Sequence, residues 1–147
     1  MNETQQQPAS WDIAWLALCL ALGFHVVDEA TNDFLSLYNP TAQSIRATFP
    51  WLPIPIFTFQ VWLSGLILAV VLLLSLSSFA FRNSPRLRPL AWFFAVLMAA
   101  NALGHFGSSI YLNRLAPGVV SSPLLLAASL YLVAQLRRTR AAQRALR

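Results

Sequence analysis

The sequence contains no lysine, only one cysteine and few charged residues of either sign. Only 10% of the 147 residues are charged and 57% are hydrophobic, whereas a typical soluble domain is about 25% charged. We therefore interpret residues 1–147 as one integral membrane domain. The single cysteine, Cys19, excludes an intrachain disulfide and a thiol-rich metal site.

The two signs of charge are separated along the chain. All five acidic residues lie in the first third, and nine of the ten arginines lie beyond position 80. The sequence has no phosphate-binding loop, dinucleotide fingerprint or nucleophile elbow. We interpret residues 137–147 as a basic cytoplasmic tail that contacts anionic lipid, and we expect no nucleic-acid partner.

Four apolar runs predict an all-α, four-helix transmembrane bundle. Each run has roughly the ~20 residues that a helix needs to cross ~30 Å of hydrocarbon. They cover about residues 11–30, 56–81, 90–113 and 118–136. Prolines and aromatic residues fill the segment between the first two runs, residues 31–55, which is predicted as an outer loop. Part of this loop is expected to lie on the membrane or to fold over the helix ends.

The arginines predict the orientation of the bundle. The 82–88 segment and the C-terminal tail carry eight of the ten arginines, so both are expected on the cytoplasmic side by the positive-inside rule. Four spans then place the N-terminus in the cytoplasm as well. We expect a bacterial inner-membrane location, and the sequence does not indicate an oligomeric state.

Ionisable side chains interrupt the first and third runs. His25, Asp28 and Glu29 are spaced i, i+3 and i+4, so they share one face of a helix. Asn101 and His105, spaced i and i+4, share a face of another. At a rise of ~1.5 Å per residue, both histidines are predicted at a similar depth in the outer half of the membrane.

Ionisable side chains are energetically unfavourable inside a bilayer. A charged residue costs about 2.5–3.5 kcal/mol at the centre of a membrane helix unless it is paired or faces protein or water. The cluster therefore indicates either a structural role or a functional site. Besides Asn101, we expect Gln60 and Tyr111 to support it, because both are predicted near the same outer level.

The order of these residues resembles the HxxEE family of small bacterial membrane proteins, which has an HxxEE motif, a second histidine and a YxPG motif. The matching residues are His25, Glu29, Asn101, His105, Pro117 and Gly118. Two positions depart from the pattern. Asp28 replaces the first glutamate, and Leu115 occupies the tyrosine position of YxPG, where Tyr111 is a candidate substitute. The resemblance implies a site without implying an activity.

Three hypotheses follow for the cluster. In the first, the candidate ligands His25, Asp28, Glu29 and His105 bind one divalent metal ion (zinc, iron or manganese) through both histidines and at least one of the two carboxylates. If Asp28 points away from the ion, Glu29 is the carboxylate ligand and Asp28 is the hydrogen-bond partner of His25. His25, Glu29 and His105 then act on an apolar or lipid-like substrate. In the second, the same histidines and Glu29 perform metal-free acid–base chemistry, as in an isomerase, or bind a small molecule. In the third, the polar residues only lock two helices together or bind a partner.

Overall fold

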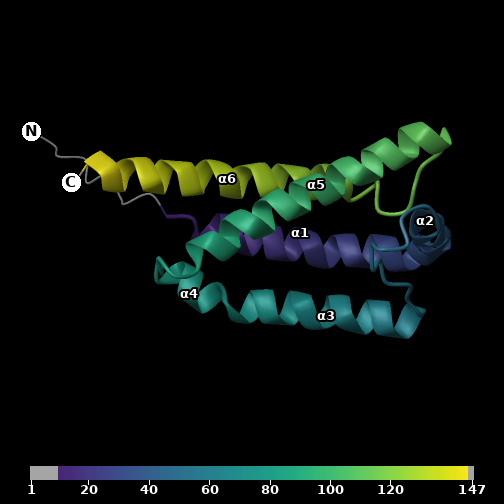
Figure 1. Cartoon of the computed structure of the whole chain (residues 1–147). Helices are drawn as coiled ribbons and strands as arrows, with labels where there is room; N and C mark the ends of the chain where they lie inside the picture. The colour runs from purple at the N-terminus through teal and green to yellow at the C-terminus, as the bar shows by residue number, and fades with distance from the viewer. Residues whose placement is uncertain (1–9, 146–147) are drawn as a thin grey trace, which may run out of the picture.

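The computed structural model describes residues 10–145, and all regular structure in this range is helical. Four long helices run roughly along one axis, a fifth lies across one end of them, and a short sixth lies at the other end (Figure 1). In chain order the helices are α1 (Asp12–Thr31), α2 (Phe34–Thr48), α3 (Phe59–Ser75), α4 (Ser77–Phe81), α5 (Arg88–Leu112) and α6 (Ser122–Ala145).

Helix α1 is the centre of the assembly. It packs against α6, α3 and α4, while α5 packs mainly against α6 and approaches α1 over a shorter stretch. Trp11, Trp15, Leu18 and Cys19 are completely buried. The ring of Trp15 meets the edge of Phe94 on α5 with centroids 5.4 Å apart. The first half of α1 is therefore held by apolar packing.

Three helical stretches are long and apolar enough to cross a membrane. They are Asp12–Thr31, Phe59–Phe81 (α3 with α4) and Arg88–Leu112. The predicted boundaries of the first and third spans agree with α1 and α5 to within about two residues, as expected for helix ends. Helix α3 has one buried residue, Trp62; its other residues are partly buried against α1 or exposed, and most of the exposed ones are apolar. Such a surface is suited to lipid and unsuited to water.

The fourth predicted span differs from the structure. The chain turns at residues 117–121, so α6 begins at Ser122 rather than near 118, and it continues through the arginines to Ala145. Its apolar part, Ser122–Leu136, would rise only about 22 Å at ~1.5 Å per residue. By length and composition α6 is therefore not among the candidate spans.

The predicted outer loop is mostly helical, which corrects the prediction for residues 31–55. Helix α2 occupies Phe34–Thr48 with Pro40 inside it, and residues 32–33 and 49–58 are free of helix. An interior proline costs about 3 kcal/mol. Contacts to the following segment compensate: Tyr38 Oη donates to the carbonyl of Pro55, and the Asn39 amide pairs with the backbone of Phe57.

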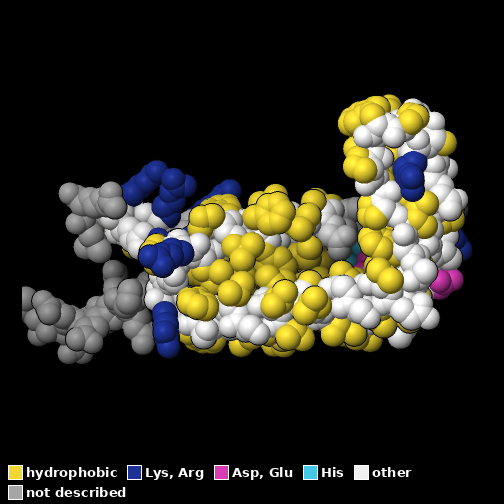
Figure 2. Space-filling model, turned by 60° about the horizontal axis from the view of Figure 1, so that its bottom comes forward, with side chains coloured by type: hydrophobic (Ala, Val, Ile, Leu, Met, Phe, Trp, Pro, Cys, Tyr) yellow, Lys and Arg dark blue, Asp and Glu magenta, His cyan; other side chains and the backbone are white. Residues whose placement is uncertain are grey.

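The two ends of the molecule differ in charge. Arginine side chains gather at the end formed by α4, the start of α5 and the end of α6, which we call the arginine end (Figure 2). Helix α2 crosses the opposite end, which we call the α2 end (Figure 1). His25, Glu29 and His105 lie in the parts of α1 and α5 nearest the α2 end.

Candidate functional site

Two histidines and a glutamate meet between α1 and α5. Glu29 Oε1 lies 3.1 Å from His105 Nε2 and 3.5 Å from His25 Nε2. The two Nε2 atoms are 3.2 Å apart. All three side chains are buried, with at most 5% of each residue exposed. The i, i+4 spacing on α1 places His25 and Glu29 on one face, and α5 supplies His105 from the facing side.

The three donor atoms form a nearly equilateral triangle. A tetrahedral ion with bonds of about 2.0–2.1 Å has ligand atoms about 3.3–3.4 Å apart. The observed edges of 3.1, 3.2 and 3.5 Å bracket this spacing. These atoms also form a group that could hold a metal ion by proximity alone. The geometry fits one ion and leaves its fourth position unassigned.

The orientation of His25 is set by its other ring nitrogen. Nδ1 lies 2.7 Å from Ser121 Oγ, and Ser121 Oγ in turn donates to Asp28 Oδ2 at 2.7 Å. Because the serine proton is directed to the carboxylate, the serine accepts from Nδ1–H. This assigns the Nδ1–H tautomer to His25 and leaves its Nε2 lone pair to accept from the Asn101 amide at 3.0 Å or to bind a metal ion. A buried carboxylate acting through a partner on a ligand histidine is a common way to orient metal ligands.

Asp28 does not join the triangle. Its Oδ2 accepts hydrogen bonds from both the backbone N–H and the hydroxyl of Ser121, and its Oδ1 accepts from the side-chain amide of Asn32 at 2.8 Å. The buried charge of Asp28 is therefore stabilised without a metal ion. Of the two placements that the sequence left open, the structure shows Asp28 behind His25, joined to it through Ser121, and not in the triangle.

The Pro117–Gly118 turn holds α6 against the cluster. Gly118 has a φ of +82°, and a Cβ at this position would lie 2.6 Å from Cε1 of His105. Only glycine adopts this positive φ without strain and leaves the space that the His105 ring occupies. The Gly118 carbonyl accepts from the Ser122 hydroxyl at 2.7 Å, which closes the turn at the start of α6. Leu115, at the tyrosine position of the YxPG motif, is 78% exposed.

The three residues expected to support the site differ in their placement. Asn101 Nδ2 lies 3.0 Å from His25 Nε2, so it contacts the triangle. Tyr111 is 88% exposed at the end of α5, and Gln60 is exposed in the first turn of α3. The structure therefore brings Asn101 to the cluster and leaves Tyr111 and Gln60 on the surface.

A pocket of about 240 Å³ opens beside the cluster, between α2 and α5. Asn101 and His105 form its polar wall. The other lining residues are mostly small or apolar: Phe34, Leu37, Ala100, Gly104 and Ser108. We call this the α2–α5 pocket. It gives a ligand direct access to His105.

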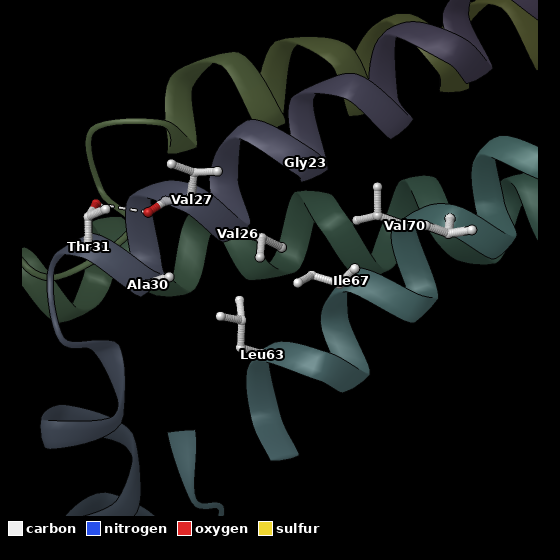
Figure 3. Close-up of a pocket in the computed structure, with 9 residues that line it drawn as sticks. Gly23, Val26, Val27, Ala30, Thr31, Leu63, Ile67 and Val70 are labelled. Atoms are coloured by element: carbon white, nitrogen blue, oxygen red, sulfur yellow. Dashed lines mark hydrogen bonds between the residues drawn. The ribbon is translucent and has the colours of Figure 1, made fainter. Parts of the chain in front are cut away.

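A second pocket, of about 370 Å³, lies between α1 and α3 (Figure 3). Gly23, Val26 and Ala30 of α1 face Leu63, Ile67 and Val70 of α3 across it (Figure 3). These α1 residues lie on a different helix face from His25 and Glu29. The lining residues include no titratable side chain, so this pocket offers no acid–base or metal chemistry.

Ser121, Asn32 and Phe34 belong to the surroundings of the site but were not expected there. Ser121 lies three residues after Gly118, close to the Pro-Gly motif of the sequence, which was the one available signal. Asn32 is one helical turn beyond Asp28, at i+4. The Phe34 ring lies 5.8 Å from that of His105, a contact created by the unpredicted helix α2.

Comparisons with known proteins point to one family. A family model described as "Protein of unknown function with HXXEE motif" matches residues 15–132. No curated protein and no solved structure matches the chain.

Proposed function

We propose that this chain, which belongs to the HXXEE-motif family, is an integral membrane protein that binds one divalent metal ion through His25, Glu29 and His105. The observation that carries the proposal is the triangle of donor atoms with edges of 3.1, 3.2 and 3.5 Å. A buried carboxylate with two imidazoles is a donor set that suits zinc, iron or manganese.

Four long helices would span the inner membrane. In this arrangement α6 is the fourth span. Its apolar part is short, and the arginines that follow it would place their charged groups at the cytoplasmic interface. The arginine end would face the cytoplasm, with both chain termini on that side. Residues 1–9 and 146–147 lie outside the described range. Helix α2 would lie at the outer interface, above the cluster.

Charge balance supports a divalent ion at the cluster. Glu29 contacts two imidazoles but, within residues 10–145, no arginine, and its carboxylate is buried. Unbalanced charge is costly in such a site. Asp28 needs no metal because three hydrogen bonds stabilise it. A divalent ion bound by neutral His25, neutral His105 and ionised Glu29 would pair with the charge of Glu29 and leave one positive charge at the site. The carboxylate of Asp28, joined to His25 through Ser121, would balance that charge.

The site is organised for chemistry as well as for binding. Three protein ligands with an open fourth position are typical of catalytic metal sites, where the ion polarises a substrate oxygen. The α2–α5 pocket gives access to that position. Asn101 lines this pocket, and its amide has a second N–H besides the one directed to His25, which could donate to a substrate oxygen. The Asp28–Ser121 pair holds His25 in its tautomer. We therefore propose a metal-dependent enzyme acting on an apolar or lipid-like substrate.

A metal-free function is the second candidate, and the Glu29–His105 contact favours it. At 3.1 Å, a protonated His105 would form a direct hydrogen-bonded ion pair with Glu29. This pair would satisfy Glu29 without a metal and would provide an acid and a base beside the α2–α5 pocket. Such a site could isomerise a lipid-like substrate by proton transfer.

Metal content decides between the two. Wild-type protein purified in detergent without chelator should contain about one equivalent of zinc, iron or manganese by elemental analysis. His105→Ala and Glu29→Gln should each lose it while remaining folded. Asp33→Asn is the matched control because Asp33 is an exposed acid near the site whose left-handed backbone (φ 54°) asparagine tolerates. Wild-type protein with no stoichiometric metal would reject the metal proposal in favour of the proton-transfer site.

A further inference from the structure

The α2–α5 pocket joins a polar wall to an apolar track along α5. Its polar wall is formed by Asn101 and His105, next to the donor triangle. The lining residues Ala100, Gly104 and Ser108 repeat every four positions, so they share one stripe of the helix. A Cβ at Gly104 would have no atom within 4 Å, so the stripe is open at this point.

The same face of α5 continues toward the arginine end as exposed apolar surface. Leu97 and Phe93, at further steps of about four residues, are 46% and 64% exposed. From His105 to Phe93 the helix rises ~18 Å at ~1.5 Å per residue. This is slightly more than half of the ~30 Å hydrocarbon thickness of a bilayer, so the track is about as long as one leaflet is thick.

The α2–α5 pocket is also apolar on the side formed by α2. Phe34 separates the α2–α5 pocket from a further pocket of about 310 Å³ beneath α2, lined mainly by aromatic and aliphatic residues. The Phe34 ring stacks on Trp62 with centroids 5.7 Å apart. Among the described residues that line the two pockets, none is an arginine or an acid. His105 is therefore the only one of these lining side chains that could carry a charge at neutral pH, and it already contacts Glu29, so these walls favour an uncharged head group over a phosphate.

We infer that the α2–α5 pocket binds a single-chain amphiphile with an uncharged oxygen head group, namely a long-chain alcohol or a long-chain ester. The head-group oxygen accepts a hydrogen bond from Asn101 and faces His105 and the cluster. The alkyl chain passes Gly104 and lies along Leu97 and Phe93. In the proposed membrane orientation, this places the head near the outer interface and the tail toward the bilayer centre, as in a lipid of the outer leaflet.

The inference takes its membrane orientation from the proposed function, but it does not need the metal. Photolabelling tests it directly. A long-chain alcohol carrying a diazirine in its chain is added to the full-length protein in lipid nanodiscs, and labelled residues are mapped by mass spectrometry. Metal content is measured on the same samples. Unlabelled alcohol and the corresponding methyl ester serve as competitors and distinguish the two kinds of head group.

Gly104→Leu is the decisive variant, and Gly107→Leu is its matched control. Both glycines lie on α5 with open space at the Cβ position, so both variants should fold and both gain helix propensity. Only Gly104 lines the pocket. We expect labelling to concentrate between Phe93 and Ser108. It should fall at least fivefold in Gly104→Leu, stay within twofold in Gly107→Leu, and be displaced by at least one competitor.

Ordinary contact with surrounding lipid gives a different result. Labelling spread evenly over the exposed surface of α3, insensitive to both competitors or equal in the two leucine variants, would overturn the inference. These outcomes are separate from the metal test. Stoichiometric metal with dispersed labelling contradicts only the amphiphile site, and concentrated labelling without metal contradicts only the metal site.

Discussion

The two halves of α1 are buried to a similar degree but by different means. Around Trp11, Trp15 and Leu18, the helix packs apolar surfaces, and the indole N–H groups of both tryptophans have no hydrogen-bond partner among residues 10–145. Around His25 and Asp28, the buried polar atoms are joined in hydrogen bonds to α6 and α5. Equal burial therefore has different consequences: the first half supports the fold, and the second half holds chemical groups in place.

The largest effect is expected from a substitution in the first half of α1. Trp15→Ala removes a completely buried ring that contacts Trp11 and Phe94, so it should lower the free energy of unfolding by about 3–5 kcal/mol. Denaturant or thermal unfolding in detergent measures this loss. Metal content per folded molecule should not change. Trp51→Ala, at a residue 77% exposed, is the control, and an equal loss in both variants would contradict the comparison.

The next substitution should lower both the stability of the fold and the metal affinity of the cluster. Gly118→Ala places a side chain at φ +82°, which costs about 1–2 kcal/mol, and its Cβ would meet the His105 ring at 2.6 Å. The ring must move, so metal affinity should fall at least tenfold. Unfolding and metal titration of one preparation measure the two effects. Gly107→Ala, where the added methyl has open space, should leave metal affinity unchanged.

A third variant affects the second half of α1 without removing a ligand. Ser121→Ala breaks the connection between Asp28 and His25 but keeps the backbone N–H bond from residue 121 to Asp28. Loss of a group that orients a ligand typically lowers metal affinity about 10–100-fold. Metal titration with a competing chelator measures it, and Ser121→Thr should restore part of the affinity. An unchanged affinity in Ser121→Ala would show that the histidine needs no such support.

The sequence predicted the helices where apolar runs were long and uninterrupted. Helices α1 and α5 follow directly from such runs. Helix α2 was not predicted because Pro40 and polar residues disrupt its pattern, and it is stabilised by contacts to the 55–57 backbone that lie far away in sequence. The start of α6 was misplaced because it depends on the conformation of the Gly118 turn.

Site residues were predictable where helical spacing fixes a shared face. The i, i+4 pairs and the depth estimate indicated that His25, Glu29, Asn101 and His105 would meet, and the structure brings these four together. The depth of a residue in the membrane does not determine which way its side chain points. Gln60 and Tyr111 were predicted at the level of the cluster but are exposed on the surface. The position of Asp28 depends on hydrogen bonds from Ser121, 93 residues away, which helical spacing cannot reveal.

The smallest expected effect distinguishes the two oxygens of Asp28. Asn32→Ala removes the amide that donates to Oδ1 at 2.8 Å, whereas Oδ2 remains bonded to Ser121, on the side of His25. Asp28 and Asn32 both line a polar pocket of about 200 Å³, together with Ser36 and Arg114 among others, which is large enough for water. Water can replace the lost donor at little cost.

Metal affinity should therefore change less than threefold in Asn32→Ala, and the free energy of unfolding by no more than about 1 kcal/mol. The same titration used for Ser121→Ala measures the difference. If Asn32→Ala weakened metal binding as strongly as Ser121→Ala, the orientation of His25 would depend on the whole carboxylate of Asp28 rather than on the single oxygen bonded to Ser121.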